Sequence, residues 1–324
     1  MASERAGRQG VDVLNKRRER ACGPGQQMRA ASDWKEYEII DTSDGEKLER
    51  WGDVLLIRPD PQIIWKGQRA SDLWKRAEAR YIRSSSGGGS WSGRPQKESW
   101  QVCYKGLVFK ISPTGFKHTG LFPEQAVNWD YMGEKIAGRL RQQPGRPVKV
   151  LNLFAYTGGA TLACARAGAQ VTHVDASKGM VSWARENAKL SGLEQRPVRW
   201  IVDDCRKFVE REIRRGNRYD ALVMDPPSYG RGPSGEVWQL EEQIYPLLEL
   251  CAGVLADDPL FFLLNSYTTG LSPSVMEYLL GVTVSKRMGG CGRLSSSEIG
   301  LPVSQSGLVL PCGNTAIWED GTEI

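Results

Sequence analysis

The chain has 324 residues, of which 40% are hydrophobic and 25% are charged. That length and composition are typical of a folded protein with one large and one smaller domain, and no stretch reaches the ~18 uncharged apolar residues of a membrane helix. The seven cysteines are scattered without a CxxC pair, and the N-terminus has no apolar signal core. We therefore expect free thiols in a reducing cytoplasm, no membrane contact and no metal site, with His118 and His173 in structural roles.

The net charge of +5 is unevenly distributed along the chain. Residues 1–31 carry +4 and residues 32–64 carry −5, whereas residues 65–117 carry +8 and the rest carries −2. The segment 65–117 interleaves eleven Lys and Arg residues with the rings of Trp65, Trp74, Tyr81, Trp91, Trp100, Tyr104, Phe109 and Phe116. Cations that neutralise phosphates beside rings that stack on bases predict a nucleic-acid surface, although some rings must belong to a core. A solvated basic face is the alternative.

The chain divides into three regions by composition. Residues 1–31 are rich in Arg and poor in large apolar residues, which predicts a flexible basic extension. Residues 32–117 predict a β-rich, substrate-binding or nucleic-acid-binding domain, because short apolar segments alternate with turn residues. Its expected elements are strands at Tyr37–Ile40 and Val54–Arg58, a helix at Leu73–Tyr81, and a hairpin of Trp100–Tyr104 with Leu107–Ile111.

The third region, residues 118–324, alternates short apolar runs with helix-length segments. The runs are Val148–Phe154, Val171–Val174, Val198–Val202, Ala221–Met224 and Leu260–Leu264. Because they are almost continuously apolar, they predict parallel strands that helices cover on both faces. The fold class is therefore α/β, with a doubly wound Rossmann-like sheet whose ligand is expected beyond the carboxyl ends of the strands.

Small and polar residues follow the first two predicted strands. The candidate ligand residues there are Phe154, Thr157, Gly158, Gly159, Asp175, Ala176 and Ser177. A glycine turn before a helix lets the backbone approach a ligand and offers unpaired N–H groups, and Asp175 can accept hydrogen bonds from both hydroxyls of a ribose. Tight packing of the turn and capping of the following helix by Asp175 or Ser177 are the alternatives.

The next two strand ends are acidic. Their candidate residues are Asp203, Asp204, Cys205, Asp225, Pro226, Ser228 and Tyr229. Unpaired buried carboxylates are costly, so these acids are expected to face a polar ligand or a helix terminus. Asp204 is placed to accept from an exocyclic amine such as that of adenine, with Asp203 as the alternative. The two prolines after Asp225 have no N–H, so they predict a rigid wall of carbonyl acceptors, with Tyr229 beside it for a flat substrate.

Together, the segments LNLFAYTGG, VDAS, VDDC and DPPSYG resemble the successive motifs of class I S-adenosylmethionine-dependent methyltransferases. The narrower resemblance is to the bacterial large-subunit ribosomal RNA methyltransferase-like group, over about residues 115–324. It implies that the glycine turn cradles the amino-acid part of the cofactor, S-adenosyl-L-methionine. It also implies that Asp175 binds the ribose, that Asp204 with Cys205 meets the adenine, and that the segment from Asp225 to Tyr229 borders both methyl donor and substrate.

The resemblance also extends to segments outside these motifs. Residues 119–125 resemble a segment that such enzymes fold over the cofactor, which implies contacts by Phe122 and Gln125. The family fold ends in a reversed strand pair, which Leu308–Leu310 and Thr315–Trp318 are expected to form.

Two departures from related enzymes bear on the chemistry. Many RNA cytosine-C5 methyltransferases attack through a cysteine thiolate, but the usual places for it read Ser228 and Asn265-Ser266-Tyr267 here, which disfavours a covalent mechanism. In amine-methylating members an aromatic residue directly follows the two prolines, whereas Ser228 precedes Tyr229 here.

These observations predict an S-adenosylmethionine-dependent methyltransferase that transfers the methyl group directly to a base of RNA, with ribosomal RNA as the nearest expectation. Residues 65–117 are expected to bind the RNA, and the oligomeric state stays open. A methyltransferase acting on a small molecule or a protein is the alternative. A nicotinamide dehydrogenase is disfavoured because G-x-G-x-x-G is missing after the first strand.

Overall fold

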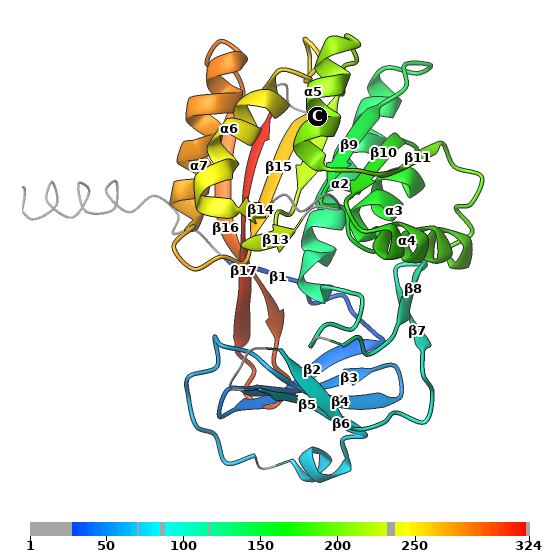
Figure 1. Cartoon of the computed structure of the whole chain (residues 1–324), viewed down its shortest axis with the longest axis vertical. Helices are drawn as coiled ribbons and strands as arrows, with labels where there is room; N and C mark the ends of the chain where they lie inside the picture. Colours follow the sequence, from blue (N-terminus) through cyan, green and yellow to red (C-terminus); the bar gives the residue numbers. More distant parts are fainter. Residues whose placement is uncertain (1–27, 70, 85–87, 116, 232–236, 322–324) are drawn as a thin grey trace, which may run out of the picture.

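The computed structural model describes residues 28–69, 71–84, 88–115, 117–231 and 237–321. Most of the expected basic extension, residues 1–27, lies outside these ranges, as does Phe116. The described chain forms an α/β domain and a smaller β-rich region at one end of it (Figure 1). Every helix of the described residues is too short or too polar to cross a membrane.

One sheet of eight strands forms the centre of the α/β domain, in the order β1-β16-β17-β15-β12-β9-β10-β11. Five parallel strands confirm the five predicted runs: β9 (Lys149–Leu153), β10 (Gln170–Asp175), β11 (Val198–Val202), β12 (Ala221–Met224) and β15 (Phe261–Ser266). Strand β17 (Val309–Glu319) pairs antiparallel with β15, and β16 (Arg293–Pro302) pairs antiparallel with β17. At the edge, β1 (Arg29–Ala30) runs parallel to β16.

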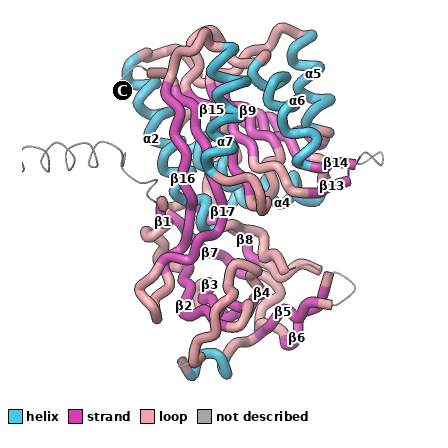
Figure 2. Tube along the Cα trace, turned by 90° about the vertical axis from the view of Figure 1, so that its left-hand side faces the viewer, coloured by secondary structure: helices cyan, strands magenta, loops and turns pink. Residues whose placement is uncertain are grey.

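Helices cover both faces of this sheet, which confirms the doubly wound α/β fold (Figures 1 and 2). They are α2 (Ala126–Gln142), α3 (Gly159–Arg166), α4 (Lys178–Leu190), α5 (Cys205–Arg214), α6 (Leu240–Ala252) and α7 (Pro273–Leu280). Successive strand residues point to opposite faces, so Val150 packs in the core with α2, α3 and α4, while Leu151 packs with α5, α6 and α7. The central strands are buried on both faces, which explains their continuous apolar sequence.

The predicted pairing of Leu308–Leu310 with Thr315–Trp318 is wrong. Apart from Leu308, which precedes it, both segments belong to the single strand β17, and β17 pairs with β15 and β16 rather than with itself. The Pro-Cys-Gly-Asn sequence between them resembles a turn, but the backbone stays extended and a register shift beside Gly300 accommodates Pro311. The resulting long hairpin reaches the β-rich region (Figure 1).

A five-stranded sheet forms the β-rich region, in the order β2-β3-β4-β5-β6. Its strands are β2 (Tyr37–Ser43), β3 (Glu46–Trp51), β4 (Val54–Pro59), β5 (Ala79–Arg83) and β6 (Gly89–Gly93). Strand β3 was not predicted, because its sequence EKLERW is largely charged. The predicted helix at Leu73–Tyr81 is wrong: a single 3₁₀ turn at Asp72–Arg76 leads into β5, where Ala79 and Tyr81 are buried and Ile82 is exposed.

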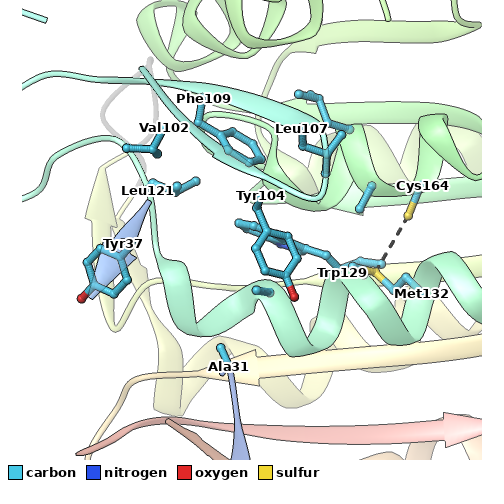
Figure 3. Close-up of a cluster of buried hydrophobic side chains, with 14 of the residues drawn as sticks. Ala31, Tyr37, Val102, Tyr104, Leu107, Phe109, Leu121, Trp129, Met132 and Cys164 are labelled. Carbon is cyan, nitrogen blue, oxygen red and sulfur yellow. Dashed lines mark hydrogen bonds between the residues drawn. The ribbon is translucent and has the colours of Figure 1, made fainter. Parts of the chain in front are cut away.

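The predicted hairpin is confirmed as β7 (Trp100–Tyr104) with β8 (Leu107–Ile111). It packs on the α/β domain, because the Ser191 hydroxyl after α4 donates to the Val108 carbonyl at 3.1 Å. Figure 3 shows Phe109 of this hairpin beside Trp129 of α2. The core is therefore continuous across residue 117, and the proposed domain boundary there stays a prediction.

Most described rings of segment 65–117 are core residues, which corrects the expectation of a row of stacking aromatics. The buried rings are Trp74, Tyr81, Trp100, Tyr104 and Phe109. Trp91 is half-buried and its indole N–H donates to the Thr114 carbonyl. Among the described rings of the segment, only Trp65 is exposed, at 42% of its surface.

A buried charge pair holds the β-rich region together. Arg58 donates to both oxygens of Glu49, at 2.5 Å and 2.8 Å, and the Tyr37 hydroxyl donates to Glu49 at 2.7 Å. Burial by itself raises the pKa of Glu49, but the charges of Arg58 and Lys47 outweigh burial and lower the pKa to about 2. Arg58 also donates to the Lys117 carbonyl at 3.1 Å, so the pair fixes the chain just before residue 118.

We expect Arg58→Met to lower the free energy of unfolding by about 3–5 kcal/mol at pH 7, because Glu49 stays buried without its partner. The pKa of Glu49 in the folded chain lies below its unfolded value of about 4.3, so the stabilisation is present above that pH and is lost as the pH falls toward 2. Urea unfolding at several pH values measures both effects. Arg50→Met, at the more exposed pair with Glu38, is the control and should cost about 1 kcal/mol or less. Equal losses in the two variants would contradict this assignment.

Candidate active site

A cavity of about 470 Å³ lies at the carboxyl ends of β9, β10, β11 and β12, where Phe154, Asp175, Asp204 and Asp225 line it. These neighbouring strands are parallel, so the residues that follow them meet at one edge of the sheet. The volume is within the range of about 300–1,000 Å³ that is typical of small-molecule sites. A second cavity of about 60 Å³ shares lining residues with it, namely Phe122, Phe154, Tyr156 and Asp225.

The structure brings most of the sequence-predicted site residues together. The larger cavity is lined by Phe122, Phe154, Asp175, Ala176, Ser177, Asp204, Cys205, Asp225, Pro226 and Ser228. Gln125, Thr157 and Gly159 line the smaller one. Gly158, Asp203 and Tyr229 line neither cavity.

Asp175 is oriented by two backbone N–H groups. Tyr156 donates to its Oδ2 and Ser177 donates to its Oδ1, both at 2.8 Å. Burial raises the pKa of Asp175, and the two hydrogen bonds act against that rise. Each carboxylate oxygen retains a further lone pair for a ligand. Ser177 caps α4 by accepting from the Met180 N–H, so the capping role falls to Ser177 and Asp175 faces the cavity.

The glycine turn between β9 and α3 has an unusual backbone. Gly158 has φ +89°, and Phe154 and Tyr156 have φ near +50°, a conformation that non-glycine residues rarely adopt. A Cβ on Gly159 would lie 2.7 Å from the Trp129 ring, so close packing of α3 on α2 requires this glycine. Left-handed backbone at two large aromatic residues costs free energy and is typical of functional sites.

The third strand end separates the two candidate acids. The Asp204 side chain caps α5 by accepting from the Lys207 N–H at 2.9 Å, and it lines the larger cavity. Asp203 instead forms an ion pair with Arg211. Cys205 is buried, and its sulfur accepts from the Phe154 N–H at 3.4 Å. The structure therefore favours Asp204 over Asp203 as a residue that contacts a ligand.

Asp225 is the carboxyl group that lines both cavities. The side-chain amide of Asn265, at the end of β15, donates to its Oδ1 at 2.9 Å. Burial raises the pKa of Asp225 to about 7. The charge of Glu124 also raises this pKa, whereas the Asn265 hydrogen bond lowers it. Near neutral pH the carboxyl group is therefore poised to accept either a hydrogen bond or a proton.

The expected wall of proline carbonyls is only partly present. The Pro227 carbonyl accepts from the indole N–H of Trp238 at 2.6 Å, because β13 (Tyr229–Arg231) and β14 (Val237–Gln239) fold Trp238 back over it. The Pro226 carbonyl has no hydrogen bond with the described residues. Ser228 shares a hydrogen bond of 2.6 Å with the Thr268 hydroxyl. Tyr229 is 55% exposed and does not line the cavity, so it does not form the expected aromatic face in this structure.

Several lining residues were missed by sequence analysis. They are His118, Tyr156, Trp238, Asn265 and Tyr267. Asn265 and Tyr267 lie at the carboxyl end of the fifth parallel strand, so the rule that located the other four ends also indicates them. No sequence pattern pointed to Trp238, which only the β13–β14 hairpin brings into place.

The two histidines differ in their surroundings. His173 is fully buried, and its Nδ1 lies 2.9 Å from the Thr161 hydroxyl, as expected of a structural residue. His118 lines the larger cavity. Burial, together with the charges of Arg58, Lys117 and Lys47, lowers its pKa to about 4, so it is neutral at physiological pH.

A sequence model of the S-adenosylmethionine-dependent methyltransferase family matches residues 64–251. The chain belongs to this family. A solved S-adenosylmethionine-dependent methyltransferase from Agrobacterium tumefaciens is 37% identical, with a TM-score of 0.81 over 90% of this chain and 92% of that one. A putative methyltransferase from Streptococcus mutans shares the fold at 15% identity, with a TM-score of 0.66 over 94% of this chain and 78% of that one. The resemblance of the motifs is thereby confirmed, and S-adenosylmethionine is the cofactor.

Curated relatives match a shorter part of the methyltransferase. The ribosomal RNA large subunit methyltransferase K/L of Shewanella baltica is 35% identical over 125 residues, which is 38% of this chain and 16% of that protein. The protein of the same name from Shewanella frigidimarina matches over the same shares. The matched segment is thus a small part of these longer relatives.

The cavity of the methyltransferase fits its cofactor chemically. Asp175 offers oriented carboxylate oxygens to hydroxyl groups, and the apolar and aromatic lining from Phe122, Phe154 and Tyr156 suits the flat and apolar parts of the ligand. The N-terminus of α3 follows Gly158 and has no side-chain cap, so its first N–H groups could bind a carboxylate.

Two of the described cysteines, Cys205 and Cys251, are poor nucleophiles in this methyltransferase. Burial raises the pKa of Cys205 and of Cys251 well above the ordinary value, so both are neutral thiols at pH 7. Of the described cysteines, Cys205 alone lines the larger cavity. The described residues thus place no ionised cysteine in the larger cavity, and direct methyl transfer stays a prediction.

We expect iodoacetamide at pH 7.5 to modify the exposed Cys291 at least about tenfold faster than Cys205 or Cys251, because the thiolate is the reactive form and both buried thiols are protonated. Peptide mass spectrometry over a time course measures the three rates. The reaction of unfolded protein provides the control, since all three thiols should then react alike. A folded-state Cys205 as reactive as Cys291 would contradict the assignment.

Proposed function

We propose that this methyltransferase transfers the methyl group of S-adenosylmethionine directly to a nitrogen of an RNA base, with ribosomal RNA as the substrate class. The observation that carries the proposal is the Asp225 carboxyl group, which lies in the cavity with a pKa near neutrality and without an activated thiol beside it. Relatives named as ribosomal RNA methyltransferases support the choice of RNA. A cytoplasmic location is part of this proposal.

For the cofactor, we assign the ribose to Asp175, supported by Ala176 and Ser177, and the adenine to Asp204 and Cys205. The backbone from Phe154 through Gly159, including Thr157 and Gly158, is assigned to the amino-acid part. Phe122 and Gln125 close the site from the segment before α2. Asp203 and Tyr229 are outside the cavity linings, and we give them no direct contact with the cofactor.

Asp175→Asn should weaken binding of S-adenosylhomocysteine by at least about tenfold, because a charge-assisted hydrogen bond to the ribose is lost. Isothermal titration calorimetry measures the dissociation constant. Asp203→Asn is the matched control, since this acid follows the neighbouring strand but pairs with Arg211, and its effect should stay within about twofold. Comparable losses in the two variants would remove the ribose role of Asp175.

The residues around Asp225 supply alignment and a proton acceptor. When bound, S-adenosylmethionine supplies an electrophilic methyl group on a sulfonium. The ionised Asp225 accepts a hydrogen bond from the attacking amine, holds it in line and takes up its proton, while the free Pro226 carbonyl is a second acceptor. Ser228 borders the same place. Because only the ionised form accepts the proton, turnover should rise with pH through about 7.

The RNA is assigned to exposed cations of the β-rich region. Several basic residues of segment 65–117 are already paired with acids, among them Arg69 and Arg80 with Glu46, and Lys110 with Glu186. Five exposed ones have no ion-pair partner among the described residues: Lys66, Arg76, Arg83, Arg94 and Lys97. The exposed Trp65 directly precedes Lys66 in sequence, and the exposed Ile82 directly precedes Arg83. Phosphate contacts by these five, with one available stacking ring, fit a surface that recognises RNA mainly through its backbone.

Methylation of a small molecule or a protein is the second candidate. The negative charge of residues 118–324 favours it, because the cavity lies in that part of the chain and three acids, Asp175, Asp204 and Asp225, line it. These acids attract cationic or amine substrates without any need for RNA.

The test is transfer of labelled methyl groups into total RNA that lacks this modification, beside protein and small-molecule fractions. We expect label in large RNA with the wild-type chain. Asp225→Ala should lower turnover at least about hundredfold while the dissociation constant of S-adenosylhomocysteine changes by less than about twofold. If label appears only in the protein or small-molecule fraction, the substrate is a protein or a small molecule and the RNA proposal is wrong. Equal losses of binding and turnover would remove the substrate-facing role of Asp225.

A further inference from the structure

A chain of buried polar side chains leads from the edge of the sheet to Asp225. The Arg29 guanidinium donates to Asn128 Oδ1 at 2.6 Å, and Asn128 Nδ2 donates to the Thr315 hydroxyl at 3.1 Å. That hydroxyl donates to Asn265 Oδ1 at 2.8 Å, and Asn265 Nδ2 donates to Asp225. Asn128, Thr315 and Asn265 are each at most 1% exposed. The chain thus connects β1, α2, β17 and β15 with the end of β12.

The direction of every hydrogen bond in this chain follows from its first member. A guanidinium can only donate, so the carbonyl oxygen of the Asn128 amide must face Arg29 and its NH₂ must face Thr315. The hydroxyl of Thr315 has one proton, which it then directs to the Asn265 carbonyl oxygen. The NH₂ of Asn265 is left to face Asp225. Reversal of any one amide would place two acceptors or two donors together in a buried site, which is costly.

A second branch satisfies the remaining groups. The other proton of Asn128 Nδ2 goes to Gln125 Oε1 at 2.8 Å, and Gln125 Nε2 donates to the Tyr267 hydroxyl at 2.9 Å. Arg29 is itself held by Ser297, to which its Nε donates at 3.0 Å. Both branches therefore end on residues that line the larger cavity, Asp225 and Tyr267.

We propose that Arg29 and Thr315 are positioning residues for methyl transfer. They orient the amide of Asn265 so that a donor faces Asp225, which keeps the carboxylate ionised and aimed at the substrate. The inference rests on the proposed role of Asp225 as the group that aligns the attacking amine.

The surroundings of Asp225 explain why one donor matters. The ionisable groups that face it are Glu124 from the segment before α2, Tyr267 after β15, and Asp175, Asp204, Cys205 and His118 across the cavity. None of these described groups is a cation at pH 7, and the charge of Glu124 opposes a negative charge on Asp225. Within the described residues, the Asn265 amide is thus the contact that favours the ionised form of Asp225.

The test measures the ionisation of Asp225 directly in the full chain. Carbon-13 NMR of labelled aspartate carboxyl groups gives its titration midpoint, with Asp225→Asn used to assign the resonance. We expect Thr315→Val and Arg29→Met to move the midpoint upward by about one pH unit, which lowers the ionised fraction about tenfold at pH values below both midpoints. Thr315→Ser and Arg29→Lys keep the hydroxyl and the obligate donor, so they should keep the wild-type midpoint.

A matched control separates positioning from loss of a buried hydroxyl. Thr283→Val removes a buried hydroxyl that bonds to the Leu279 carbonyl outside the chain of hydrogen bonds, and it should leave the midpoint unchanged. Binding of S-adenosylhomocysteine reports that each variant keeps a folded site. The acidic limb of the profile of kcat against pH should move with the NMR midpoint.

Two outcomes overturn different claims. A wild-type midpoint in both Thr315→Val and Arg29→Met overturns the positioning inference, whatever the activity of the enzyme. The other outcome is a shifted midpoint in Thr315→Val and Arg29→Met while Asp225→Ala keeps the turnover of the wild type. That result supports the positioning of the carboxylate and overturns the proposed catalytic role of Asp225.

Discussion

The parallel pairing of β9 with both β10 and β12 is the constraint on which the site depends. Leu153 of β9 pairs with Val174 on one side and with Met224 on the other. The residues that follow, Phe154, Asp175 and Asp225, therefore meet at one edge of the sheet although they are far apart in sequence. The helix that follows each of these strands starts at this edge and runs back to the opposite edge, where the next strand begins. Loops, helix N-termini and the β13–β14 hairpin therefore lie at this edge. For that reason the cavity, the acidic side chains and the backbone N–H groups lie together at this edge of the sheet.

Buried polar groups lock the glycine turn to these strands. The Thr161 hydroxyl of α3 accepts from Asn152 Nδ2 of β9 at 2.9 Å and lies at the same distance from His173 Nδ1 of β10. All three residues are buried, so loss of any partner would leave an unsatisfied polar group in the core. This triad ties α3, the helix that follows the turn, to β9 and β10.

The β-rich region supports the cavity wall as well as offering the proposed RNA surface. The Ser304 N–H, in the loop between β16 and β17, donates to the Ile39 carbonyl, and Trp34 Nε1 donates to the Pro123 carbonyl. The segment from Lys117 to Gln125 is thereby held between the two sheets, and its Gly120 carbonyl accepts from the Thr157 hydroxyl. The proposed RNA surface and the proposed cofactor site are therefore connected through this segment.

Local sequence determined the α/β class, the five parallel strands and most of the cavity lining. Continuous apolar runs mark strands that are buried on both faces, and the residue after such a strand reaches the ligand edge in any fold of this class. Asp175, Asp204 and Asp225 could thus be located without coordinates. The strand β3 was not predicted because its charged residues pair with residues on neighbouring strands, as Glu49 does with Arg58 of β4.

Tertiary structure alone decided which side chains the site can use. The rings of Trp74, Tyr81 and Phe109 became core because neighbouring elements cover them, and spacing in sequence does not report such cover. The Pro227 carbonyl accepts a hydrogen bond from Trp238, eleven residues further along the chain, and is therefore not an open acceptor for a substrate. The proposed control of Asp225 ionisation runs from Asn265 through Thr315 to Arg29. These residues are far apart in sequence, and they come together because β1, β15 and β17 belong to one sheet. Burial and donor direction are properties of that assembly, so no local pattern encodes them.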